Sequence, residues 1–132
     1  MAKLVPHKCV DRFQLGITTE VVVEYLGQPN IAENIGSHLY WDYQSECLSF
    51  EFHEKNKLIV IEAYSPEITL WGTNIKGQSQ EFVTNFLQKN GYRDLETRSM
   101  ENDANIWLIS TELGLSFDFE YDKLWLVEVC KE

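Results

Sequence analysis

The sequence predicts an α+β fold, in which one antiparallel sheet is built from two tandem units with their helices packed on one face. Each unit is a helix, or a pair of helices, followed by three strands. The 132 residues include 44% apolar and 24% charged residues, which is typical of a globular chain. A block at residues 16–26 recurs at 77–87, and a second block at 41–62 recurs at 107–128 in the same order. Because three strands are barely stable alone, we expect the two units to share one sheet.

The first repeated block predicts a helix in each unit. Thr18 and Ser79 are suitable N-cap residues, and an acidic residue follows each of them in the first helical turn. The apolar residues recur at i, i+1, i+4 and i+5, which predicts one buried helix face. Its members are Val21, Val22, Tyr25 and Leu26 in the first helix and Phe82, Val83, Phe86 and Leu87 in the second. A strand remains the alternative for the first block, because three consecutive valines are poor helix formers.

The second repeated block predicts the strands. Leu48, Phe50 and Phe52 alternate with polar residues, which is typical of a strand with one buried face. The same alternation occurs at residues 115–119, and Trp41 aligns with Trp107 ahead of the two alternating segments. A further strand is predicted after each of the two alternating segments, over residues 57–62 and 123–128.

The repeat also predicts the organisation of the chain. We assign residues 1–64 to the first unit, 65–76 to a linker that contains Pro66 and Gly72, and 77–132 to the second unit. The two units are expected to form one compact domain.

Charge and cysteine content restrict the class of partner and the location. The net charge of −10 disfavours nucleic acid and anionic membranes, and it favours a basic protein partner, although acidity also simply keeps a protein soluble. Cys9, Cys47 and Cys130 are odd in number and widely spaced, which argues against a disulfide framework or a zinc motif. With no long apolar run at the start of the sequence, the expected location is the cytoplasm.

The first unit resembles a known family. Its pattern is Gly16-x-Thr18-x-x-x-Val22-x-x-x-Leu26-Gly27-x-Pro29, followed by Trp41-Asp42-Tyr43 and an alternating strand. This pattern resembles the outer-membrane assembly lipoprotein BamE and the wider group that includes the beta-lactamase inhibitory protein. The resemblance implies two-helix, three-strand units in tandem on a curved sheet, whose exposed face binds another protein without catalysis. The chain departs from the family in lacking a lipid-attachment cysteine at its start, and no inhibitor contact loop is identifiable.

Motifs for catalysis and metal binding are missing from the sequence. The three histidines show no H-x-x-x-H or H-E-x-x-H spacing, and there is no G-x-S-x-G or phosphate-binding glycine loop. We therefore expect no enzymatic activity, no cofactor and no metal. Asp118, Glu120 and Asp122 alternate along a predicted strand and could meet a cation, but a solvated acidic edge explains them as well.

The function that the sequence favours is protein binding through an acidic, aromatic sheet face that docks a basic partner, as in an inhibitor or a toxin-immunity protein. Two alternatives stay open: a small-molecule-binding or housekeeping protein, and a structural subunit that forms a homodimer. Candidate contact residues are acidic residues on the alternating strands and tryptophans without an assigned place in the core: Glu51, Trp71, Asp118, Glu120 and Trp125.

Overall fold

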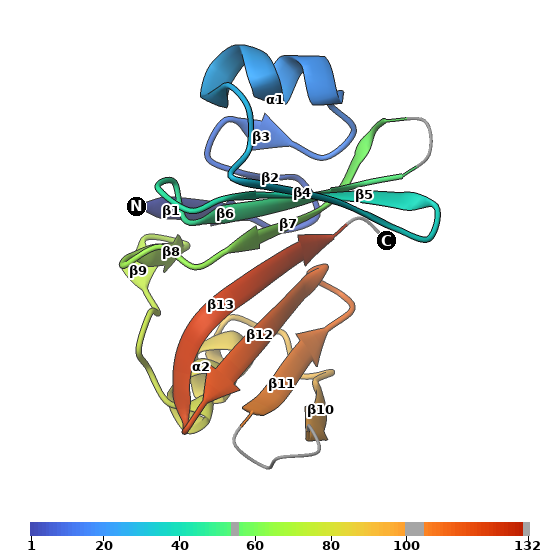
Figure 1. Cartoon of the computed structure of the whole chain (residues 1–132). Helices are drawn as coiled ribbons and strands as arrows, with labels where there is room; N and C mark the ends of the chain where they lie inside the picture. Colours follow the sequence, from blue (N-terminus) through green and yellow to red (C-terminus); the bar gives the residue numbers. More distant parts are fainter. Residues whose placement is uncertain (54–55, 100–104, 131–132) are drawn as a thin grey trace.

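The computed structural model describes residues 1–53, 56–99 and 105–130, and this part of the chain consists mainly of β-strands. It forms an eight-stranded sheet and a five-stranded sheet, with two short helices (Figure 1). The predicted α+β fold of helix-plus-three-strand units is therefore wrong. The sequence did not reveal the additional strands because several of them are short or lie at sheet edges. Such strands show no alternation of apolar and polar residues.

The large sheet is antiparallel throughout, and its two halves meet where β13 pairs with β7. Strands β4 to β7 form one half, and β10 to β13 form the other. The edge strands β4 and β10 are exposed at every position, so burial leaves no pattern in their sequences. The strand order is β10 (Glu96–Ser99), β11 (Asn105–Ser110), β12 (Leu115–Glu120), β13 (Lys123–Cys130), β7 (Leu58–Ala63), β6 (Leu48–Phe52), β5 (His38–Tyr43) and β4 (Ile31–Ile35).

The small sheet joins the start of the chain to its middle. Its order is β3 (Phe13–Gln14), β2 (Cys9–Val10), β1 (Ala2–Val5), β8 (Ile68–Leu70) and β9 (Thr73–Asn74). Strand β1 pairs in parallel with β8, and β9 follows β8 along the chain. Two strands of the small sheet therefore lie within the segment assigned as a linker, and the boundaries at residues 64 and 76 stay a prediction.

The two helices are α1 (Thr19–Leu26) and α2 (Gln80–Lys89). The Ser79 hydroxyl accepts a hydrogen bond from the Phe82 amide at 3.1 Å, whereas Thr18 contributes no comparable side-chain cap. In α1 the buried residues are Thr19 and Val22, and the Tyr25 side chain is 53% exposed. The predicted apolar face of the first helix is therefore buried only in part.

Backbone hydrogen bonds attach the entrance of each helix to the last strand of its own half. The Gly16 amide donates to the Leu58 carbonyl at 2.7 Å, and the Leu58 amide donates to the Ile17 carbonyl at 2.8 Å. In the other half, Leu124 makes the corresponding two bonds with residues 77 and 78. These bonds hold the helix entrances beside β7 and β13.

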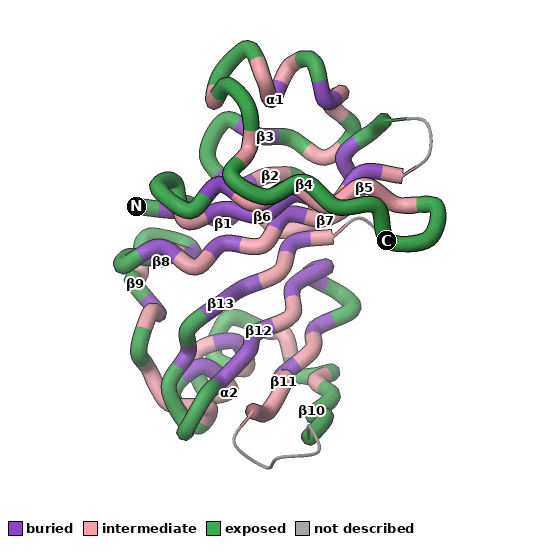
Figure 2. Tube along the Cα trace, in the orientation of Figure 1, coloured by how far each residue is buried: buried purple, intermediate pink, exposed green. Residues whose placement is uncertain are grey.

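Buried apolar residues from both sheets and both helices form one hydrophobic core, and buried positions recur along the central strands of the large sheet (Figure 2). Its largest fully buried side chains include Phe50, Phe52, Phe117 and Phe119 from the alternating strands β6 and β12. Val22 of α1 and two residues of α2 join the same cluster. The other side of the large sheet carries the residues that alternate with these phenylalanines.

Candidate binding face

The open face is the side of the large sheet that faces away from the core, and a row of directly paired residues crosses its centre. Along this row the partners on neighbouring strands are, in order, Asp42, Ser49, Glu62, Glu128, Ser116 and Ile109. Side chains alternate along a strand, so the residues two positions away from this row also lie on the open face. Glu51 and Asp118 are two of these flanking residues.

Several carboxyl groups crowd the centre of the open face. Burial is the largest cause that raises the pKa of Glu62, and the charges of Glu128, Glu51, Asp118 and Asp42 raise it further, to about 7. Burial and the charge of Glu51 also raise the pKa of Glu128. A face that holds carboxylates against their own repulsion carries a strong negative potential, which attracts cations.

Asp118 is the most deeply buried acid of this group. Its residue is 5% exposed, and burial raises its pKa although hydrogen bonds from Asn105 and Trp125 oppose that rise. The Asn105 amide nitrogen lies 3.3 Å from Asp118 Oδ1. Trp125 lies beside Asp118, next to a bulge in the β12–β13 pairing.

Two basic side chains on the open face contact acidic residues. His38 Nδ1 lies 2.7 Å from Glu51 Oε1, and Arg98 Nε lies 3.0 Å from Glu96 Oε1. Neither of these two pairs involves Asp42, Glu62 or Glu128. The acids Asp42, Glu62 and Glu128 therefore lack a described cationic partner within ion-pair distance.

Two shallow pockets lie on either side of the central glutamates. The first has a volume of about 370 Å³ and is lined by Tyr40, Asp42, Gln44, Ser49, Tyr64, Trp125 and Leu126. The second has about 300 Å³ and is lined by Arg98, Trp107, Ile109, Ser116 and Glu128. Tyr40 and Trp107 take equivalent positions, because Tyr40 pairs with Glu51 and Trp107 pairs with Asp118. The pockets differ in charge, because an aspartate lines the first where an isoleucine lines the second.

The structure brings together four of the five predicted contact residues. Glu51, Asp118 and Trp125 lie on the open face, and Glu120 follows Asp118 on the same side at the exposed end of β12. Trp71 lies apart from them in the turn between β8 and β9. Its ring stacks on Tyr92 with 5.4 Å between centroids and also contacts Phe86 of α2.

The three alternating acids at 118–122 do not form a cation site. Asp118 is engaged by Asn105 and Trp125, whereas Asp122 Oδ1 accepts a hydrogen bond from the Gln80 amide at 3.0 Å, at the start of α2. Across residues 1–53, 56–99 and 105–130, no group of three or more potential ligands is placed to hold a metal ion.

The sequence reasoning missed the residues at the centre of the face, which are Tyr40, Asp42, Glu62, Tyr64 and Glu128. The alternation of β5, with Leu39, Trp41 and Tyr43 towards the core, is a signal that could have found the first two. The alignment of Trp41 with Trp107 hid this signal because it is wrong by one residue. Trp41 pairs with Phe50 on the core side, and Trp107 pairs with Asp118 on the open face. A slip of one residue exchanges the two faces of a strand.

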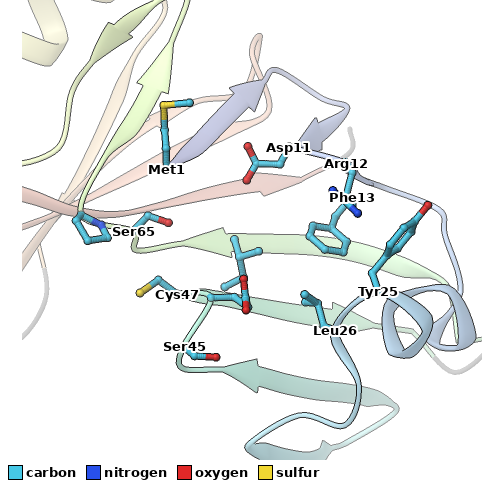
Figure 3. Close-up of a pocket in the computed structure, with 12 residues that line it drawn as sticks. Met1, Asp11, Arg12, Phe13, Tyr25, Leu26, Ser45, Cys47 and Ser65 are labelled. Atoms are coloured by element: carbon cyan, nitrogen blue, oxygen red, sulfur yellow. The ribbon is translucent and has the colours of Figure 1, made fainter.

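A larger pocket lies on the other side of the molecule, beside α1 (Figure 3). It has a volume of about 530 Å³ and is bordered by α1, the turn between β5 and β6, and the segments around residues 11–13 and 65–66. The Arg12 guanidinium lies 4.9 Å from the centre of the Tyr25 ring, and Asp11 Oδ1 accepts a hydrogen bond from the Lys3 amide at 2.9 Å. These charged groups of the pocket are thus engaged within the chain.

Comparison with known proteins identifies solved structures that share the fold of this chain. No family model matches this sequence, and no curated protein is detectably similar to it. Two solved structures are similar in fold. An extracellular protein containing an SCP domain from Bacillus anthracis matches with a TM-score of 0.57 and 14% identity, over 89% of this chain and 44% of that chain. A cysteine-rich secretory protein from Staphylococcus aureus matches with a TM-score of 0.53 and 9% identity, over 89% of this chain and 43% of that chain.

The fold of this chain occurs in SCP-containing proteins. The chain spans less than half the length of each of these two chains. The resemblance to BamE and the beta-lactamase inhibitory protein is therefore wrong. Its pattern specifies a helix start, a helix face and a helix stop, and such local features occur in unrelated folds.

The comparisons also contradict the expected cytoplasmic location and the toxin-immunity role. The matching proteins are described as extracellular and as secretory, which points away from the cytoplasm. The expected cytoplasmic location rested partly on the absence of paired cysteines, and Cys9, Cys47 and Cys130 are free thiols in this structure. Neither described helix has the length and apolar character needed to cross a bilayer.

Proposed function

We propose that this chain is a non-enzymatic module that binds another protein outside the cell, with the open face as its contact surface. The observation that carries this proposal is the row of carboxyl groups across β5, β7 and β13, which the described part of the chain leaves without paired cations. A basic surface docked there would offset the repulsion between Glu62 and Glu128. The extracellular setting is supported by the descriptions of the two proteins that share the fold.

The partner we propose is a basic protein surface. The chain carries a net charge of −10, and charges of one sign on a face attract and orient a partner of the opposite sign. Trp107 and Trp125 add aromatic contacts on either side of the central glutamates. Aromatic side chains are frequent contributors of binding energy at interfaces.

A pull-down with matched variants tests this proposal. The immobilised chain is incubated with secreted proteins from the organism that makes it, at low and at high salt. We expect a basic protein to be retained, to be lost at high salt, and to be lost when Glu51→Gln and Asp118→Asn are combined. The control combines Glu20→Gln and Glu24→Gln on α1, which removes the same charge elsewhere. A retained protein that both double variants bind equally would refute the open face as the contact surface.

A second candidate function is small-molecule binding in the pocket beside α1. The observation that favours it is the volume of about 530 Å³, which lies in the range of ligand sites. A thermal-shift screen with metabolites tests it, with Leu26→Trp as the variant that would fill the pocket. A stabilising compound that keeps its effect on this variant would not bind there.

A further inference from the structure

The first pocket of the open face, between β5 and β13, has a specific chemical character that the proposed function does not require. Strand β5 contributes Tyr40 and Asp42 to its border, and β6 contributes Ser49. The other border is formed by Tyr64, which directly follows β7, and by Trp125 of β13. Three aromatic side chains thus surround one carboxylate in a hollow of about 370 Å³. Aromatic faces and a carboxylate are the two groups that attract organic cations most strongly.

The carboxylate is held in a fixed orientation. Asp42 Oδ1 accepts a hydrogen bond from Ser49 Oγ at 2.8 Å and another from the Tyr64 hydroxyl at 2.7 Å. The Tyr40 hydroxyl donates to Ser49 Oγ at 3.1 Å and so extends the network across the pocket. The bonds from Ser49 and Tyr64 both end on Oδ1, and within residues 1–53, 56–99 and 105–130 no hydrogen-bond donor is placed on Oδ2. One oxygen of a preoriented carboxylate is thus left for an incoming donor.

Lys76 links two of the residues that line the pocket, Tyr64 and Trp125. Its ammonium group donates to the Tyr64 carbonyl at 3.2 Å and to the Trp125 carbonyl at 2.7 Å, which ties the two aromatic residues together through their backbones. This cation forms no described ion pair with Asp42, so the charge of the carboxylate is not neutralised from within. Burial is the largest cause of the raised pKa of Tyr40 and of Tyr64, and the charge of Asp42 raises both further.

We infer that this pocket receives an arginine side chain of the partner, with the guanidinium donating to Asp42 and stacking against the Trp125 and tyrosine rings. Arginine fits better than lysine because its planar group both stacks on aromatic faces and presents several donors to a carboxylate. In the equivalent hollow on the other side of the glutamates, Ile109 occupies the place of Asp42, and a basic residue, Arg98, lines it together with Glu128. The inference rests on the proposed function and identifies the contact at its centre.

The experiment uses N-acetyl-arginine amide, its lysine and citrulline analogues, and the full chain. Binding is followed by the NMR shift of the Trp125 indole N–H, which is assigned by its loss in Trp125→Phe. We expect the arginine compound to shift this signal with higher affinity than the lysine compound, and the uncharged citrulline compound to leave it unchanged. In Asp42→Asn the affinity should fall by roughly tenfold, which corresponds to about 1.4 kcal/mol. In Glu24→Gln, which carries the same charge change on α1, it should stay within about twofold, as salt screening limits distant charges.

Equal binding of citrulline and arginine, or an affinity unchanged by Asp42→Asn, would overturn the inference. If Asp42→Asn does not fold, Tyr64→Phe replaces it, because this variant keeps the ring and removes one donor that orients the carboxylate. An Asp42→Asn chain that still retains the basic partner in the pull-down, while the Glu51→Gln and Asp118→Asn chain does not, refutes the arginine site and leaves the proposed function intact. If the unmodified chain retains no basic protein in the pull-down but still binds the arginine compound, the proposed function is refuted and the arginine site stands.

Discussion

Glu62 and Glu128 lie directly opposite each other in the β7–β13 pairing that joins the two halves of the large sheet. Both carboxyl groups are partly buried, and burial is the largest cause of the raised pKa of each. Two acids facing each other at a junction oppose its formation whenever both are ionised. The junction therefore depends on how many protons this pair holds.

Stability should fall as pH rises from about 4.5 to about 7, as a result of this pair. The pKa of Glu62 is raised in the folded chain to about 7, so the unfolded chain releases its proton first and is favoured as pH increases through this range. Below about pH 4 both states hold the proton and the effect vanishes. We expect Glu62→Gln to stabilise the fold by up to about 3 kcal/mol at pH 8 and to have little effect at pH 4.

Thermal unfolding of Glu62→Gln and the unmodified chain from pH 4 to 8 measures this difference. Glu67→Gln, at an exposed position outside the row, is the matched control. A gain from Glu62→Gln that is the same at every pH would show that the carboxyl group does not titrate as described.

Lys76→Met should destabilise the fold by about 1–3 kcal/mol, because two carbonyl groups lose a charged donor at once. Methionine keeps most of the apolar length of the side chain, so the loss reports the ammonium group. Urea unfolding measures the change, and Lys8→Met, at an exposed residue, is the control. Equal stabilities of the two variants would mean that the bonds to Tyr64 and Trp125 contribute nothing.

Gly114→Ala should destabilise the fold far more than Gly36→Ala. Both glycines have positive φ, +66° and +61°, so both substitutions carry the backbone strain of about 1 kcal/mol. At Gly114 a methyl group would also collide with the His7 imidazole and the Cys130 carbonyl, whereas Gly36 has open space around it. The His7 ring contacts the Glu112 carbonyl at 2.6 Å, so the collision would separate the turn after β1 from the β11–β12 turn. Similar melting temperatures for the two variants would contradict this packing.

Trp41→Ala should mainly reduce the stability of the fold, whereas Trp107→Ala should mainly weaken partner binding. The Trp41 ring packs against Phe52, with 5.0 Å between centroids, and belongs to the core side of β5, so its loss should cost about 3 kcal/mol. Trp107 lines a pocket of the open face, so its loss should cost about 1 kcal/mol or less and should weaken partner binding. Denaturant unfolding and the pull-down together separate the two roles, and a larger stability loss for Trp107→Ala would place it in the core.

The parts of the fold that could be predicted from the sequence are those whose burial leaves a local pattern. Both helices form where their caps and apolar residues indicate, and β6 and β12 bury the phenylalanines that alternate in their sequences. Local geometry sets these patterns, because helix and strand place neighbouring side chains at fixed periods. The small sheet was not predictable in this way, since β1 and β8 are short and pair across most of the first half of the chain.

The candidate site shows the same division. An acidic chain with alternating strands indicates that acids such as Glu51 and Asp118 share a sheet face, and composition alone favours a basic partner. The register between strands adds what alternation cannot: it sets Glu62 against Glu128, turns Trp41 inward and Trp107 outward, and gathers Tyr40, Tyr64 and Trp125 around Asp42. Register depends on contacts between residues far apart in the chain, and a shift of one residue would reverse which side chains face the core.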